Sequence, residues 1–250
     1  MIASLPMYDW PEVRPANDRF WASIADHARA AGLRLPERLT RDGDLWAQWE
    51  APDLILSQTC GLPYRARLVG KVRILGSPDY GLEGCPPGFY ASKIVVRARD
   101  RATAPTEWHG KRLAYNERRS QSGWASILNH AAQLGVGFKS EVASGSHRQS
   151  ARMVAQGEAD ITAIDAQSWR LVQAHDPWAG DLQVIGQTEP TPATPFITAG
   201  HRDAETVRVL RHALRQAVAE VSAQDRAQLH LRDVVDVDEA LYLAVPTPRV

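Results

Sequence analysis

A stretch of alternating strand and helix patterns between Leu113 and Asp165 restricts the fold of this chain more than any other feature of its sequence. Three short apolar runs predict strands, over residues 113–116, 138–143 and 161–164. Apolar residues at helical spacing follow the first two runs: Trp124, Ile127, Leu128, Ala131 and Leu134, and then Ala151, Val154 and Ala155. Strands that alternate with helices in this way predict an α/β fold.

Polar loops rich in hydroxyl side chains join the first two of these strands to their helices. They are Ser120-Gln121-Ser122-Gly123 and Ser144-Gly145-Ser146-His147, and Asp165 directly follows the third strand. Helix N-termini present unpaired N–H groups and the positive end of the helix dipole, and such ends bind anions. Since ligands of open α/β sheets bind outside the carboxyl ends of the strands, the loops indicate a site for a small ligand with an anionic and a donor-rich part. Ordinary capping of the two helices by serine is the alternative explanation.

The charge balance argues against several classes of partner. Lys plus Arg and Asp plus Glu number 29 each, so no overall field draws the chain to nucleic acid or to an anionic membrane. No stretch approaches the roughly 20 apolar residues of a membrane span. Met1 to Trp10 has neither the basic start nor the apolar run of a signal peptide. We therefore expect no nucleic-acid partner, no membrane insertion and no export signal in this chain.

The chain has two cysteines, Cys60 and Cys85. Their spacing fits neither a zinc site nor a redox Cys-x-x-Cys pair, so we expect neither a metal nor a cofactor. Both should lie in loops of the same lobe, and we predict that they are close enough to form a disulfide. Such a bridge would argue for an oxidising compartment, whereas two reduced thiols are the alternative.

Before residue 89 the sequence predicts a first series of strands and helices. The clearest helix runs from Asn17 or Asp18 to Ala31, with Phe20, Trp21 and Ile24 on one face. The other elements expected here are strands over 2–6, 34–39, 53–57 and 72–75 and a short helix after Asp44.

Two later strands predict crossings of the chain between two lobes. A long strand over 89–97 precedes the second strand–helix series, and a strand over 196–199 follows three prolines. After the second crossing, a helix over 203–221 should cover the first lobe. We therefore expect residues 1–89 and 196–250 to form lobe 1, and residues 90–195 to form lobe 2.

Several segments resemble a known family in their order and spacing. They are Ser120-Gln121-Ser122-Gly123, Gly145-Ser146-His147-Arg148, Gly157-Glu158-Ala159-Asp160-Ile161 and Pro192 to Ala199. In these segments the chain resembles the phosphate, phosphite and phosphonate substrate-binding proteins of ABC transporters. The resemblance implies an α/β fold of the periplasmic-binding-protein type 2 kind. Two lobes, each a mixed sheet flanked by helices, are joined by two crossover strands, with the ligand clamped between them.

The resemblance also assigns ligand-binding roles to individual residues. Ser120, Gln121 and Ser122 match the loop that binds the oxyanion, and His147 matches a histidine beside that anion. Asp165 matches an acidic residue that faces the amino group of the ligand in phosphonate binders. Residues matching positions that line the cleft or close on the ligand are Tyr90, Tyr8 and Thr59. Gln121 stands where the best phosphonate-binding loops have a small hydroxyl residue, which leaves the ligand open.

A family of this kind implies partners and a compartment. We expect a monomer that binds a small anionic ligand and works with an ABC permease. The periplasm is implied by the resemblance, whereas the absent signal peptide favours the cytoplasm if Met1 is the native start.

The leading hypothesis is a binding protein without catalytic residues. His147 near two serines could act as a Ser–His pair, but the Gly-x-Ser-x-Gly elbow of hydrolases is missing. The alternative is a cytoplasmic enzyme or sensor module on the same fold that acts on a small metabolite, such as a precursor of pyrimidines or menaquinone, since a fold does not determine a function.

Overall fold

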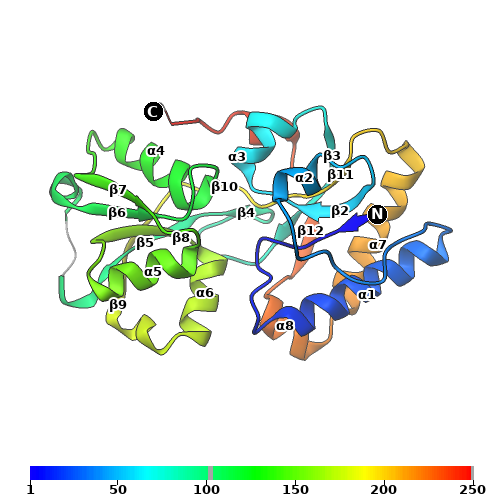
Figure 1. Ribbon diagram of the computed structural model, residues 1–250, viewed down its shortest axis with the longest axis horizontal. Coiled ribbons are helices and arrows are strands. Elements are labelled where there is room, and N and C mark those ends of the chain that lie inside the picture. Colours follow the sequence, from blue (N-terminus) through cyan, green and yellow to red (C-terminus); the bar gives the residue numbers. More distant parts are fainter. Residues whose placement is uncertain (101–103, 249–250) are drawn as a thin grey trace. The chain divides into compact units, whose positions relative to one another are not determined.

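The computed structural model describes residues 1–100 and 104–248, and the chain divides into two compact units (Figure 1). Unit 1 comprises Met1–Phe89 and Pro192–Leu243, and unit 2 comprises Tyr90–Thr191 and the segment after Leu243. The carboxyl-terminal segment was expected in lobe 1. It belongs to unit 2 instead, where the side-chain amide of Asn129 donates a hydrogen bond to the carbonyl of Pro246 at 2.9 Å.

Unit 1 is built on a five-stranded mixed sheet. In spatial order its strands are β1 (Ile2–Ala3), β2 (Leu54–Gln58), β11 (Phe196–Ala199), β3 (Val72–Asp79) and β12 (Asp233–Val235). Strand β1 runs parallel to β2, and β11 runs antiparallel to both β2 and β3. The carboxyl ends of β1, β2 and β3 therefore lie at one edge of the sheet, together with the amino end of β11.

Helices cover both faces of the unit 1 sheet (Figure 1). Those on one side are α1 (Arg14–Ala30), α7 (Ala204–Glu220) and α8 (Ala223–Leu229). Those on the other side are α2 (Leu45–Trp49), α3 (Gly61–Pro63) with the π-helical turn Tyr64–Leu68, and α9 (Glu239–Leu243). The predicted apolar face of α1 is buried, and burial of each side chain as large as Phe20 or Ile24 contributes roughly 1.5–3 kcal/mol.

In unit 1 one predicted strand is absent and one observed strand was not predicted. Residues 34–39 form no strand, because Pro36 has no N–H to donate and the segment only places Leu35 and Leu39 in the core. The short strand β12 was not predicted, since Asp233 and two valines give too little pattern to distinguish a strand from a loop.

Unit 2 contains a second five-stranded mixed sheet. Its spatial order is β7 (Ser140–Ala143), β6 (Arg112–Tyr115), β8 (Ile161–Asp165), β5 (Ser92–Arg97) and β9 (Leu182–Gln187). Strand β6 is parallel to both β7 and β8, as the strand–helix repeat predicts, whereas β5 is antiparallel to β8 and β9. The parallel group brings the carboxyl ends of β6, β7 and β8 to one edge.

The helices of unit 2 follow the strands of the parallel group. They are the π-helical turn Gln121–Ala125 continuing into α4 (Ser126–Gln133), then α5 (His147–Gln156) and α6 (Ala166–His175). A core cluster that includes Leu113, Ile127 and Ile161 packs α4 onto one face of the sheet. Figure 1 shows α5 and α6 on the other face. Shorter helical turns cover Ala98–Asp100, Pro105–Gly110 and Pro177–Asp181.

The predicted strand over 89–97 is interrupted at Ala91. Its first part, β4 (Phe89–Tyr90), pairs with β10 (Thr191–Pro192), and its second part is β5. The break arises because the strand changes partners, and the Ala91 carbonyl accepts a hydrogen bond from the N–H of Ala166 at 2.9 Å.

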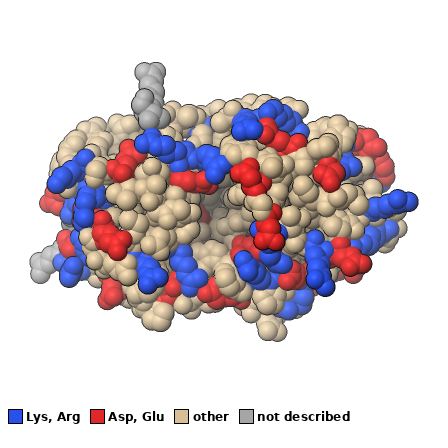
Figure 2. Space-filling view, viewed as in Figure 1, with Lys and Arg blue, Asp and Glu red and all other residues tan. Residues whose placement is uncertain are grey.

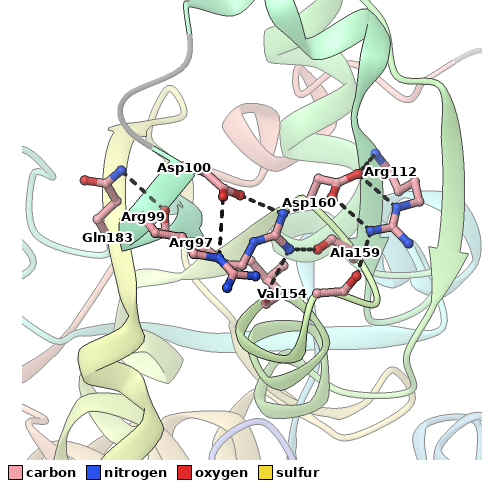
Figure 3. A network of polar contacts seen from close by, with 9 residues as sticks. Arg97, Arg99, Asp100, Arg112, Val154, Ala159, Asp160 and Gln183 are labelled. Carbon is pink, nitrogen blue, oxygen red and sulfur yellow. Dashed lines mark hydrogen bonds and ion pairs between the residues drawn. The ribbon is translucent and has the colours of Figure 1, made fainter.

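An ion-pair network fixes the carboxyl end of α5 (Figure 3). The Asp160 carboxylate accepts hydrogen bonds from Arg112 at 2.9 Å and from Arg97 at 3.1 Å. The same arginines donate to carbonyls at the end of α5, Arg97 to Val154 at 3.2 Å and Arg112 to Gly157 at 2.7 Å. The hydrogen bonds from Arg112 hold the pKa of Asp160 well below its usual range.

Candidate functional site

Three helices begin at the carboxyl edge of the unit 2 sheet, and a side chain caps each of them. Ser120 accepts a hydrogen bond from the N–H of Gly123 at 2.9 Å. Ser146 accepts one from Gln149 at 3.1 Å, and Asp165 accepts one from Ser168 at 2.8 Å. Capping by serine, the alternative explanation for the two hydroxyl-rich loops, is thus observed in both, and the cap formed by Asp165 was not predicted. Because the strands end side by side, the positive ends of three helix dipoles lie at one edge.

Within this edge, Ser122, His147 and Asp165 meet side chain to side chain. The Nε2 atom of His147 lies 2.9 Å from the Oγ atom of Ser122 and 3.2 Å from the Oδ2 atom of Asp165. Ser122 and Asp165 are 5% and 2% exposed. Three residues predicted from separate segments of the sequence therefore form one contiguous group.

The protonation of His147 follows from its partners. A carboxylate can only accept hydrogen bonds, so the Nε2 atom that faces Asp165 carries the proton. Burial lowers the pKa of His147, against the opposing effect of the nearby Asp165 charge, and so favours the neutral ring. The one Nε2–H is then shared between the Asp165 carboxylate and the Ser122 hydroxyl, which leaves the hydroxyl proton of Ser122 for an anion.

The same geometry does not match a hydrolytic triad. In a Ser-His-Asp triad, the serine and the carboxylate contact opposite nitrogens of the imidazole ring. Here Ser122 and Asp165 both lie next to Nε2 of His147, and Nδ1 has no hydrogen-bond partner among the described residues. The group can bind and orient a ligand, but it does not relay a proton from serine through histidine to aspartate.

A layer of serines behind the loop fixes its main chain. The Ser122 carbonyl accepts hydrogen bonds from the hydroxyls of Ser92 at 2.8 Å and Ser126 at 2.5 Å. Ser92 begins β5, and its N–H is bound by the Thr188 hydroxyl at 3.0 Å. Sequence reasoning missed these two serines. No local signal marks Ser92, because the polar Lys93 follows it directly in the sequence.

Gly123 is required by close packing at the start of the helix. A Cβ atom at this position would lie 2.1 Å from Oδ1 of Asn116 and 2.9 Å from Cε1 of His147. Only glycine therefore lets the serine loop, Asn116 and the imidazole ring approach one another. Asn116, which follows β6, was not among the predicted site residues.

The other predicted residues are distributed over both units. In unit 2, Ser120 and Gln121 are buried in the same loop as Ser122, and Tyr90 is buried at the end of β4. Tyr8 and Thr59 belong to unit 1 and are buried as well. The structure therefore brings Ser120, Gln121, Ser122, His147 and Asp165 together, whereas Tyr8 and Thr59 belong to a separate part of the fold.

In unit 1, the predicted Tyr8 lies at the carboxyl edge of that sheet beside a second tyrosine. The ring of Tyr8 contacts Tyr80 edge to face, with centroids 5.2 Å apart. The Gln58 side-chain amide lies 3.4 Å from the Tyr80 hydroxyl. Tyr80 follows β3 directly, and it was not among the predicted site residues.

The predicted disulfide is not formed in this structure, where Cys60 and Cys85 are both thiols. Each is held in its own segment by main-chain hydrogen bonds. The Cys60 carbonyl accepts from Tyr64 at 3.1 Å, and the Cys85 N–H donates to Leu82 at 3.1 Å. Local structure in the two loops thus sets the place of each cysteine.

Over the described ranges, 1–100 and 104–248, no cluster of three or more His, Cys, Asp and Glu side chains is arranged to hold a metal ion. Nor is any helix in those ranges both long enough and apolar enough to span a membrane.

Comparison with known proteins links the fold to one family. Residues 64–242 match the family model described as ABC transporter, phosphonate, periplasmic substrate-binding protein. No curated protein matches the sequence.

Solved structures share the fold at low sequence identity. PhnD1 from Prochlorococcus marinus in complex with methylphosphonate is 14% identical, with a TM-score of 0.74 and coverage of 96% of this chain and 94% of that one. A binding-protein component of a phosphonate ABC transporter from Pseudomonas aeruginosa is 15% identical, with a TM-score of 0.72 and coverage of 97% and 82%. A Xanthomonas citri protein bound to chloride ion is 14% identical, with a TM-score of 0.73 and coverage of 96% and 92%.

Proposed function

Since the chain belongs to the family of periplasmic substrate-binding proteins of phosphonate ABC transporters, we propose that it binds a small tetrahedral oxyanion of the phosphonate or phosphate type at the Ser120–Gly123 loop. Proteins of this family are transporter components that bind substrate, and they are not enzymes. The alternative of a cytoplasmic enzyme on the same fold is not favoured.

One observation carries the proposal: Ser122 and His147 meet 2.9 Å apart where two helices begin. Helix N-termini bind phosphate groups through main-chain N–H groups and the helix dipole. The Ser122 hydroxyl adds a donor that His147 holds in place. Serine, imidazole and helix dipole together suit an oxyanion better than a cation or an apolar molecule.

The roles of the remaining predicted residues are part of the proposal. Ser120 and Gln121 belong to the Ser120–Gly123 loop that is proposed to bind the oxyanion. Tyr8, Thr59 and Tyr90 are proposed to contact other parts of the ligand. Asp165 already binds Ser168 and His147, which supports a role in orienting the imidazole. Its proposed direct contact with an amino group of the ligand is a separate hypothesis.

We further propose that the protein acts as a monomer in the periplasm, delivers its ligand to an ABC permease and binds no nucleic acid. The family model names the periplasm and the transporter. Basic and acidic side chains are intermixed on the face drawn in Figure 2, which suits a protein that does not bind a polyanion through a uniformly basic surface.

A ligand screen tests the proposal. Thermal unfolding is measured with methylphosphonate, phosphate, phosphite, methanesulfonate and acetate. A ligand present at 100 times its dissociation constant adds about 2.7 kcal/mol to the free energy of unfolding, which is a clear shift in Tm. We expect a phosphonate, phosphate or phosphite to give the largest shift. A shift produced only by acetate, or by none of the five, would contradict the proposal.

A further inference from the structure

Unit 1 contains a cavity with a volume of about 500 Å³, and every residue that lines it belongs to that unit. Its walls come from β3, from α7 and from the segment that joins β12 to α9. Gly70, which precedes β3, and Gly200, which follows β11, are part of the lining. Because β11 runs antiparallel to β3, these two glycines lie at the edge of the sheet opposite to the carboxyl ends of β1, β2 and β3. The cavity is therefore distinct from that carboxyl edge.

The part of β3 that borders this cavity has a neighbouring strand on one side only. Strand β12 pairs with β3 at residues 77–79 and no earlier. Over residues 72–76, β11 is the one strand that pairs with β3 in the described chain. After Val235 the chain leaves the sheet, and Asp236 and Val237 line the cavity instead. The cavity thus lies along a stretch of β3 that β12 leaves unpaired.

Two arginines line the cavity, and neither forms an ion pair with a carboxylate among the residues that the structure describes. Nη1 of Arg73 donates to the Arg202 carbonyl at 2.9 Å, and Nη2 of Arg211 donates to the Ile74 carbonyl at 2.9 Å. Asp203 is near enough to Arg73 for their charges to interact, but its carboxylate is occupied as the cap of α7. A guanidinium has five N–H donors, so each arginine keeps several for a ligand.

The two acidic side chains that line the cavity already have partners. Asp236 accepts a hydrogen bond from Arg215 at 2.7 Å, and Glu239 accepts one from the hydroxyl of Tyr64. Burial of Tyr64, together with its bond to Glu239, raises the pKa of this tyrosine, so the hydroxyl keeps its proton and remains a donor. Both carboxylates are thus engaged, whereas the two lining guanidinium groups are bound only to main-chain carbonyls.

The rest of the lining is largely apolar. Val72 is buried, and the half-buried side chains of Ile74 and Val237 pack against the same core cluster. Ligand pockets of proteins usually enclose roughly 300–1,000 Å³ and combine apolar walls with a few polar groups. A bare inorganic anion would occupy little of this cavity. The lining therefore suits a ligand that has an anionic group and an apolar body.

We propose that this cavity is a second ligand site, which binds a small organic anion through a carboxylate or phosphate group held by Arg73 and Arg211. The planar fork of a guanidinium matches two oxygens of either group. The apolar body of the ligand lies against Val72, Ile74 and Val237. The site goes beyond the proposed function, because all of its residues belong to unit 1 and the Ser120–Gly123 loop belongs to unit 2.

The test is a titration of the isotope-labelled wild type, followed through the backbone amide signals of Gly70, Gly76 and Gly200, which all line the cavity. Phenylacetate and phenyl phosphate are the probes, since they share an apolar ring and differ in the anionic group. We expect saturable shifts of these three signals with at least one of the two, and the tighter probe identifies the preferred group. 2-Phenylethanol, which has no charge, should cause none. Acetate, which has no apolar body, should need at least about ten times more ligand for half-saturation.

Variants of the two arginines test how the anion is held. Arg73→Gln and Arg211→Gln should each raise the concentration for half-saturation roughly tenfold or more, because a hydrogen bond to a charged group is lost. Arg211→Lys, which keeps the charge and loses the fork, should lie between the wild type and Arg211→Gln. Arg208→Gln is the matched control, since Arg208 is exposed on the same helix, donates to Glu205 at 2.8 Å and does not line the cavity. The control should titrate like the wild type.

Three results would overturn this second site. The first is the absence of saturable shifts at the three glycines with both organic anions. The second is equal half-saturation in the wild type, Arg73→Gln and Arg211→Gln. The third is binding of 2-phenylethanol as tight as that of the anions, because the cavity would then select for the apolar body alone. None of these results bears on methylphosphonate binding at the Ser120–Gly123 loop, so the two proposals stand or fall separately.

Discussion

The Nε2 atom of His147 lies 2.9 Å from the Oγ atom of Ser122, although the two residues are 25 positions apart in the sequence. His147 is the first residue of α5, and Ser122 belongs to the helical turn that precedes α4. Their contact brings the starts of two helices together, so that the main-chain N–H groups of both helices and the Ser122 hydroxyl form one group of hydrogen-bond donors. A site for an oxyanion can form there because both helices follow parallel neighbouring strands.

Ser122→Ala and His147→Ala should each weaken the binding of methylphosphonate by roughly ten- to a hundredfold. A lost hydrogen bond to a charged group is worth about 1.5–3 kcal/mol, and the measurement is isothermal calorimetry. Ser222→Ala is the control, because Ser222 caps α8 in unit 1 in the same way that Ser120 caps its helix. The control should lose about 1 kcal/mol of stability without losing affinity. Unchanged affinity in both site variants would show that these loops cap their helices and do not bind the ligand.

Asp165→Asn should weaken methylphosphonate and 2-aminoethylphosphonate by similar factors. Asparagine can still cap α6, so the fold should persist, but the charge that faces His147 is lost. Since the charge of Asp165 raises the pKa of His147, the pKa of the imidazole should fall further in the variant. An NMR titration of the ring proton measures this change. A loss confined to the amino-bearing ligand would instead place Asp165 in direct contact with the ligand.

Acid should destabilise the ligand-free protein partly through His147. Burial holds the pKa of this imidazole below the ordinary value of about 6.5. Between the pKa of His147 in the folded protein and that in the unfolded chain, the unfolded chain binds more protons than the folded protein. The contribution of His147 to the free energy of unfolding is therefore complete above about pH 6.5 and is lost as the pH falls through the folded pKa. The fall in Tm between about pH 7.5 and about pH 5 should therefore be smaller in His147→Gln than in the wild type. Equal falls in both proteins would show that this histidine titrates as it does in the unfolded chain.

Gly123→Ala should reduce both stability and affinity. The added methyl group would lie 2.1 Å from Oδ1 of Asn116, so the serine loop has to shift. Gly110→Ala is the matched control in the same unit, because a Cβ atom there meets no atom within 4 Å. Thermal unfolding and calorimetry on both variants compare the two positions. A Gly123→Ala protein that binds methylphosphonate like the control would show that close packing of the loop is not needed.

The sequence predicted those helices and strands whose local apolar pattern also fits the order of elements along the chain. The repeat of strand, hydroxyl-rich loop and helix in unit 2 predicted the parallel group β7, β6 and β8 from its apolar runs and from the apolar faces of the helices, although the edge strand β7 is largely exposed. The same pattern predicted that Ser122, His147 and Asp165 lie near one another, because the loops that follow parallel neighbouring strands all lie at the same edge of the sheet. Their mutual distances could not be predicted, because they depend on the packing of the helices.

Other features depended on partners far away in the sequence. Residues 34–39 were predicted as a strand but pair with no strand in the described chain, and β5 and β4 separate at Ala91 because each has a different partner. Ser92, Asn116 and Tyr80 were missed for a similar reason. Nothing in their local sequence marks them, and their roles arise from hydrogen bonds or contacts formed across the fold.

The most direct test of the oxyanion site is a titration of isotope-labelled protein with methylphosphonate, followed through backbone amide signals. We expect saturable shifts that are largest for the N–H groups of Gln121, Ser122 and His147, because an anion at these helix starts is bound through main-chain donors. The same titration of Ser122→Ala should require a higher ligand concentration for half-saturation. Saturable binding that leaves these amides unshifted and moves signals elsewhere would contradict the site described here.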